Sequence, residues 1–160
     1  MTQIDDLIAD LERENAGEPW HGPSRAAVLA DVDASLAARR PPGGAHTIWE
    51  LVLHMTAWTG EVARRLRGAT AGLPPEGDWP PMPAPSDDAW RAAKRALDDA
   101  HRELVASLRT LPPERLDDVV RTTPTSPEVA GVSYAVTVRG VLQHDAYHSG
   151  QIAILKRVLR

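Results

Sequence analysis

The chain has 160 residues, a formal net charge of −4 and no cysteine. It has the length of one domain, and it cannot form disulfides, thiolate metal sites or a cysteine nucleophile. The negative charge and the lack of aromatic residues interleaved with basic ones argue against a nucleic-acid partner. No apolar stretch approaches the about 20 residues of a membrane span. The acidic first eleven residues lack the basic start and apolar centre of a signal peptide, so we expect a cytoplasmic protein.

Prolines and glycines divide the sequence into blocks of helical length. In the first block, apolar residues recur at helical spacing and predict an amphipathic helix over 3–15. Ser24 is an N-cap candidate for a second helix, which Pro41 and Pro42 bring to an end. The apolar face of this second helix is formed by Val28, Leu29, Val32 and Leu36.

A capping box opens the third helix, because Thr47 can accept from the Glu50 amide while Glu50 reaches back to Thr47. This helix should run to about Arg67, with Gly68 as its stop. Residues 69–85 contain six prolines around Trp79. They are too irregular for a helix and predict a long connection that lies over the bundle.

Ser86 caps the next predicted helix, whose apolar residues follow steps of three and four as far as Leu111. Residues 114–132 are mixed, with short extended pieces expected at Val119-Val120 and over 129–132. The last helix is expected over 134–159.

The long helical blocks each carry one apolar stripe. Packing four helices antiparallel is the most economical way to hide four such stripes. We therefore expect a single all-α domain over residues 1–160, an antiparallel four-helix bundle with Pro-rich connecting loops.

His144 and His148 are the clearest chemical signal. A spacing of four places both imidazoles on one helical face, inside the apolar stripe of the last helix. Metal ligation by one ring nitrogen and a hydrogen bond at the other would satisfy such buried rings; hydrogen-bonded core histidines are the alternative interpretation. His54 lies at the edge of the apolar face of another long helix. Two ligands from one helix and one from a neighbour would form an open three-histidine site, with a position left for water or substrate.

Three segments resemble the DinB/YfiT-like superfamily: Trp20-His21-Gly22-Pro23-Ser24, residues 46–54 and residues 143–152. The resemblance covers nearly the whole chain, the Asp78-Trp79-Pro80 loop fits the same pattern, and the HxxxHxGQI motif of the last segment is the most specific part. Members are described as four-helix bundles with a divalent metal on three histidines, which implies His54, His144 and His148 as ligands. Characterised relatives include thiol S-transferases, isomerases and proteins proposed as metal-dependent hydrolases. The resemblance thus implies a metal site and leaves the reaction open.

The leading hypothesis is a metal-dependent enzyme. A divalent ion on the three histidines would activate bound water or bind a thiol as its thiolate, which makes the protein either a hydrolase or a low-molecular-weight-thiol S-transferase. A non-enzymatic, metal-dependent sensor or binding module is the alternative. Zinc or nickel is the expected metal, and iron and manganese also accept such ligands. The expected partner is a small-molecule substrate, with a low-molecular-weight thiol as one candidate, and the resemblance also implies a homodimer.

Four residues near the predicted ligands are candidates for supporting or catalytic roles. Glu50 could orient His54, or it could serve only as a helix cap. Gln151 could face the pocket or lie at the edge of the core. Asp145 could accept from a ligand imidazole or form an ion pair, and Tyr147 flanks the ligand face.

The remaining histidines have simpler assignments. His21 lies in a loop that could close over the mouth of the bundle, where it is either a fourth ligand or an ordinary loop residue. His101 is expected to pack at the edge of the core, and His46 is expected to be exposed.

Overall fold

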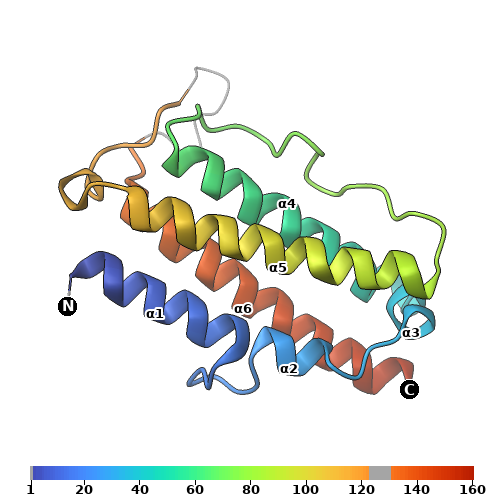
Figure 1. Cartoon of the computed structure of the whole chain (residues 1–160). Coiled ribbons are helices and arrows are strands. Elements are labelled where there is room, and N and C mark those ends of the chain that lie inside the picture. Colours follow the sequence, from blue (N-terminus) through green and yellow to red (C-terminus); the bar gives the residue numbers. More distant parts are fainter. Residues whose placement is uncertain (1, 123–130) are drawn as a thin grey trace.

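A computed structural model shows an all-helical fold and describes residues 2–122 and 131–160 (Figure 1). Its α-helices are α1 (Gln3–Ala16), α2 (Arg25–Leu29), α3 (Ala34–Ala38), α4 (Ile48–Leu66), α5 (Asp87–Thr110) and α6 (Tyr134–Leu159). Two short 3-10 helices, η1 (Pro42–Gly44) and η2 (Pro113–Arg115), lie in the connections. Within the described ranges no strand forms, and no helix is long and apolar enough to cross a bilayer.

The four long helices begin and end near the predicted residues, because the signals that cap them are local. At the start of α4, Thr47 Oγ1 accepts from the Glu50 amide at 3.1 Å, and the Glu50 carboxylate accepts from the Thr47 amide at 2.8 Å. The Ser86 side chain accepts from the Ala89 amide at 3.1 Å and caps α5 in the same way. Gly68 follows the end of α4 with φ +92°, a conformation that favours glycine.

The prediction of one continuous second helix is wrong, because this stretch is divided into α2 and α3. The Asp33 side chain accepts from the Leu36 amide at 2.8 Å and starts α3 afresh. Ser24 precedes α2, but its side chain forms no cap hydrogen bond. All four predicted apolar residues of the stretch are nevertheless buried, so the two short helices and the link between them, which contains Val32, present to the core the side chains expected from one longer helix.

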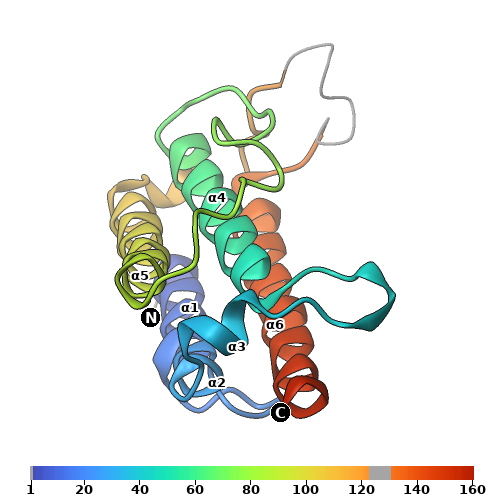
Figure 2. The ribbon, with the colours of Figure 1, turned by 90° about the vertical axis from the view of Figure 1, so that its right-hand side faces the viewer.

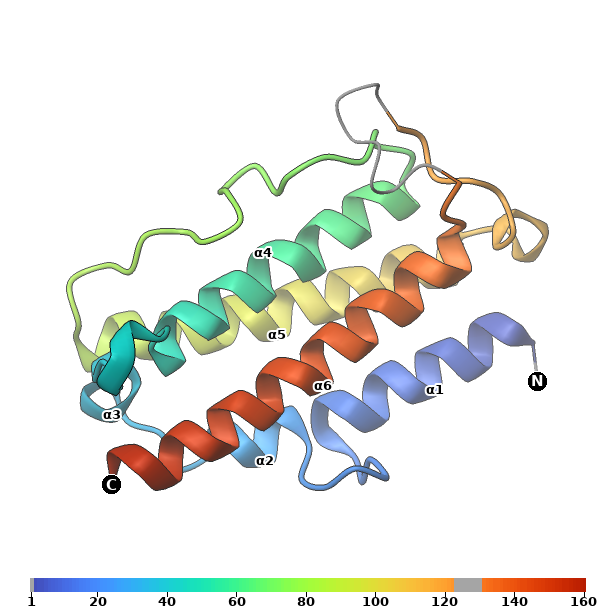
Figure 3. The same ribbon diagram turned by 180° about the vertical axis from the view of Figure 1, so that it is seen from behind.

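The four long helices pack side by side, but they are not all antiparallel to their neighbours (Figures 2 and 3). Near the starts of α4 and α5, Trp49 and Trp90 are in contact with ring centroids 5.1 Å apart. Near the ends, Arg67 and Glu103 form an ion pair of 2.8 Å, so these helices run in the same direction. The helices α1 and α6 form the second parallel pair and run against the first (Figure 3). The expected antiparallel bundle is therefore replaced by two parallel pairs of helices that run in opposite directions (Figure 3).

The long connection between α4 and α5 explains this order. It runs along the outside of α4 and returns the chain to the end of the bundle where α4 began (Figure 3). The helix α4 has 19 residues and is about 28 Å long at 1.5 Å per residue. The connection over residues 67–86 spans that distance easily when extended. A short loop would instead have made α5 an antiparallel neighbour of α4.

The core consists of two apolar clusters, one at each end of the bundle. Along α6, Val141 belongs to the first cluster and Ile152 to the second. His144 and His148 lie between them in the sequence, opposite His54 of α4. The three histidines thus lie in the middle of the bundle, between two apolar clusters that pack the helices at either end.

The segment before α6 contains a minimal extended pairing. Val119 forms an isolated antiparallel bridge with Ser133, and the Val120 amide donates to the Val132 carbonyl at 2.9 Å. This agrees with the extended piece predicted at Val119-Val120. Of the piece predicted over 129–132, residues 129 and 130 lie outside the described ranges.

Candidate metal centre

Three imidazoles converge between α4 and α6 in the middle of the bundle. His54 comes from α4, and His144 and His148 come from successive turns of α6. The Nε2 atoms of His54 and His144 lie 2.9 Å apart, and those of His144 and His148 lie 3.0 Å apart. Ligand atoms of all three residues lie within 4.8 Å of one another. The structure thus brings together the three histidines that the sequence singles out.

The outer nitrogens of two of these rings are held by acceptors. His54 Nδ1 donates to the Asp78 backbone carbonyl at 2.6 Å, and His148 Nδ1 donates to the Gln151 side-chain oxygen at 2.7 Å. A carbonyl oxygen only accepts, so each Nδ1 carries the proton and each Nε2 turns a lone pair toward the centre. His144 Nε2 can donate one proton and can satisfy only one of these lone pairs. The three inward nitrogens therefore suit a cation better than a hydrogen-bond network.

The spacing of the nitrogens also suits a metal ion. Zinc–nitrogen bonds of about 2.0–2.1 Å in tetrahedral geometry place two ligating nitrogens about 3.3 Å apart, close to the separations of 2.9 and 3.0 Å seen here. Three imidazole ligands leave a fourth tetrahedral position for water or substrate, as in catalytic zinc sites. Imidazole ligands also suit nickel, iron and copper, so the ligand set alone does not select the metal.

Comparison with known proteins places this arrangement in a family. A family model described as the DinB superfamily matches residues 3–152. The chain belongs to the DinB superfamily. Neither the curated proteins nor the solved structures gave a match. The matched region extends from α1 through most of α6 and contains all three histidines, so the superfamily resemblance of the three short segments is confirmed over the helical core.

The DinB site favours neutral imidazoles. Burial, followed by the charges of His148 and His54, lowers the pKa of His144 to about 4. Burial also lowers the pKa of His148, although its hydrogen bond with Gln151 acts in the opposite direction. The neutral imidazole is the form that binds a metal ion, so protons compete weakly for these ligands at neutral pH.

In the metal-free protein, the contribution of His144 to stability should fall as the pH falls from about 6.5 toward 4. The pKa of His144 is lowered from 6.5 to about 4 by folding, so within this window the proton binds only to the unfolded chain. The His144 contribution to the free energy of unfolding should then fall by up to about 1.4 kcal/mol per pH unit, while Asp145, whose pKa burial raises to about 6, contributes in the opposite direction. Urea denaturation of chelator-treated protein at a series of pH values measures this slope. His144→Gln should reduce it, and an equal slope in that variant would contradict the assignment.

The long connection before α5 supports His54 from outside the bundle. The backbone carbonyl of Asp78 accepts from His54, and its carboxylate accepts from the Trp58 indole nitrogen at 2.7 Å. Trp79 stacks on His54 and on His46, with ring centroids 3.9 and 3.5 Å away. Trp79 thus places the connection over the bundle as predicted. The role of Asp78 was not predicted from the residues, and its place in the superfamily loop pattern was the only signal for it.

Of the two residues Glu50 and Gln151, only Gln151 contacts one of the three histidines in the way predicted for a supporting residue. The Glu50 carboxylate accepts from the Thr47 amide and from Arg40, the latter at 2.6 Å. It therefore acts as a helix cap and ion-pair partner, and it does not orient His54, whose outer nitrogen already bonds to another group. Gln151 lies beside His148 and accepts from the outer nitrogen of its ring.

Asp145 and Tyr147 lie beside the clustered histidines in sequence but contact them little or not at all. Asp145 is 5% exposed and pairs with Arg25 at 2.5 Å, on the side of α6 that faces α2. Of the two predicted roles of Asp145, the structure shows the ion pair, and its carboxylate forms no hydrogen bond with the described imidazoles. Tyr147 is 64% exposed, and its ring meets His148 edge-on with centroids 5.1 Å apart.

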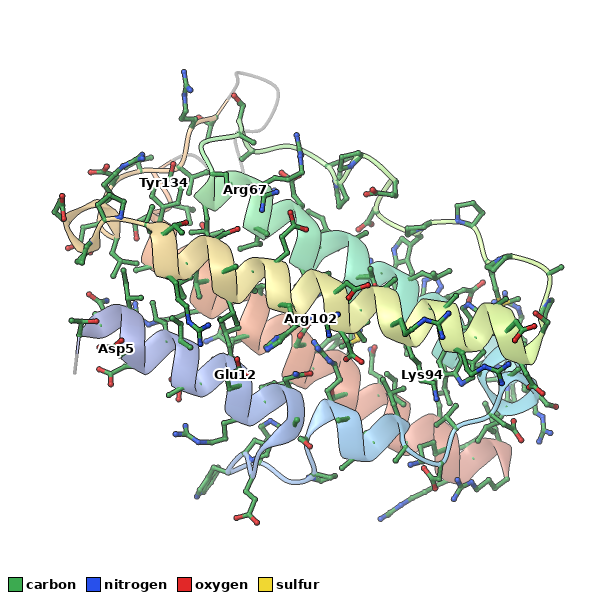
Figure 4. All side chains as sticks on the ribbon, viewed as in Figure 1. Asp5, Glu12, Arg67, Lys94, Arg102 and Tyr134 are labelled. Carbon is green, nitrogen blue, oxygen red and sulfur yellow. The ribbon has the colours of Figure 1, made fainter. Side chains whose placement is uncertain are left out.

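The remaining histidines lie outside the cluster. His21 contacts the Glu14 carboxylate at the end of α1, so the structure does not place it as a fourth ligand. His101 is buried on α5 and lies 3.3 Å from the carboxylate of Glu12 on α1, which is labelled in Figure 4. His46 is half exposed where it stacks on Trp79.

Proposed function

We propose that this DinB protein is a metal-dependent enzyme that holds one divalent ion on His54, His144 and His148. The proposal is supported above all by the convergence of the three Nε2 atoms, two of which have lone pairs fixed toward the centre. Zinc or nickel is the proposed metal.

A bound divalent ion supplies a nucleophile at neutral pH, because it lowers the pKa of a coordinated water or thiol. The residues of the chain prepare the site for that ion. The Asp78 carbonyl and Gln151 hold two rings with Nε2 inward, and Trp79 covers one face of His54 and excludes water from it. Such held ligands require little reorganisation when the ion binds. The proposed reaction is either hydrolysis or transfer involving a low-molecular-weight thiol. The open coordination position would hold water in the first case and the thiol in the second.

Metal content and metal-dependent turnover test this proposal. Untagged protein purified without chelator or a nickel column should contain about one equivalent of zinc or nickel, measured by elemental analysis. A panel of activated esters and amides, and an electrophile offered with a low-molecular-weight thiol, should separate hydrolysis from transfer. Turnover should disappear after chelation and return when the metal is restored. A folded protein that binds neither zinc nor nickel in titration would overturn the proposal, and metal binding without turnover would favour the sensor or binding module.

A further inference from the structure

A cavity of about 440 Å³ lies between α4 and α6 and begins at two of the three clustered histidines. His54 and His144 form its polar end. Its walls include apolar side chains of both helices: Trp58, Val62, Val136 and Val141. Small-molecule sites are apolar concavities of about 300–1,000 Å³ with a few placed polar groups. The cavity has that size and lining, and its polar end coincides with the proposed metal site.

Two charged residues line the cavity, and both are engaged by the protein. Arg65 donates to the Glu61 carboxylate at 2.9 Å and to the Gly72 carbonyl at 2.8 Å, and its guanidinium lies over the Trp58 ring. The Asp78 carboxylate accepts from the Trp58 indole nitrogen, the polar atom of that ring. The described lining thus meets a ligand mainly with apolar surface, and each of its two charged side chains has at least one protein partner.

We infer that this cavity binds the apolar body of the substrate, an uncharged aliphatic or aryl group, while a donor atom at one end of the substrate reaches the open coordination position. The inference rests on the metal site proposed above. Each methylene group removed from water in such a cavity raises affinity by about fourfold. A charged or sugar-like body would lose hydration here against a mainly apolar wall that offers few polar partners. The substrate class is therefore an apolar molecule with one metal-ligating group.

Gly140 determines how much of the cavity is open. It lines the cavity one turn before His144 on α6, and a Cβ built at this position meets no atom within 4 Å. A larger side chain there can enter the cavity without a clash at its base, and the helix tolerates residues other than glycine well. Gly140 is thus a specificity-determining position, and Gly140→Phe should exclude the apolar body. Gly150 has the same free space on α6 but lies outside the cavity lining, so Gly150→Phe is the matched control.

Two hydroxamates that share one metal-ligating group test the inference. Acetohydroxamate and hexanohydroxamate differ by four methylenes, and their binding to cobalt-loaded protein can be followed by the visible cobalt spectrum. Hexanohydroxamate should bind the parent at least about tenfold more tightly, since part of its tail is buried. In Gly140→Phe this ratio should fall below about threefold, with little change for acetohydroxamate. Gly150→Phe should keep the ratio of the parent.

The outcomes separate this inference from the proposal on which it rests. Cobalt content is measured first, and a folded protein that takes up no cobalt would overturn the metal site and the inference together. Cobalt-loaded parent that binds both hydroxamates equally would overturn the inference alone. A ratio retained in Gly140→Phe would also overturn it, because the tail would then lie elsewhere.

Discussion

Replacing His148 by alanine should lower the affinity for zinc by more than about 100-fold. The change removes one of three ligands and leaves Gln151 without the imidazole that it orients. Loss of a residue that only supports a ligand typically costs 10–100-fold in metal affinity, so loss of a ligand should exceed that range. Competition with a chelating dye of known affinity at pH 7 measures the change.

A second histidine variant controls for unspecific binding. His21 contacts Glu14 in the loop after α1 and lies outside the cluster. His21→Ala should therefore bind zinc within about threefold of the parent, because no proposed ligand changes. Both variants should show the helical circular dichroism of the parent. Folded His148→Ala with the zinc affinity of the parent would show that the ion binds elsewhere.

Two of the three clustered histidines could be predicted from the sequence because their pattern is local. His144 and His148 are one helical turn apart, and Gln151 follows within another turn, so helical periodicity alone puts them on one face. Asp78 could not be found in this way. It holds His54 through a backbone carbonyl, which every residue has, and its position depends on the path of a Pro-rich connection. Local patterns do not encode that path.

The parts of the fold that were predicted incorrectly depend on competition between signals or on distant contacts. Helical spacing favours one helix from Val28 to Leu36, but the cap at Asp33 divides it. The direction of α5 depends on the length of the connection before it, which neither helix encodes. The partner of Asp145 is Arg25, 120 positions away in the sequence, so its identity required the fold.

Asp145→Ala should lower the free energy of unfolding by about 3–5 kcal/mol, the usual effect of breaking a buried ion pair. Arg25 is only 1% exposed. After the change its guanidinium would be buried with a single remaining side-chain acceptor, Asn15, at 2.7 Å. Urea denaturation of the metal-free protein measures the loss. Asp99→Ala, which removes an exposed ion pair with Arg102 on α5, is the control and should change stability by less than about 1 kcal/mol.

Removing both partners should have a much smaller effect than removing one. Burial raises the pKa of Asp145 to about 6 although Arg25 acts in the opposite direction, so the desolvation of the carboxylate outweighs its attraction to Arg25. The double variant Arg25→Met/Asp145→Leu should therefore be as stable as the parent or more stable. Because Asp145 faces away from the cluster, Asp145→Ala should also keep the zinc affinity of the parent within about threefold. A tenfold loss of affinity in folded protein would instead return Asp145 to the metal centre, where one interpretation of the sequence had placed it.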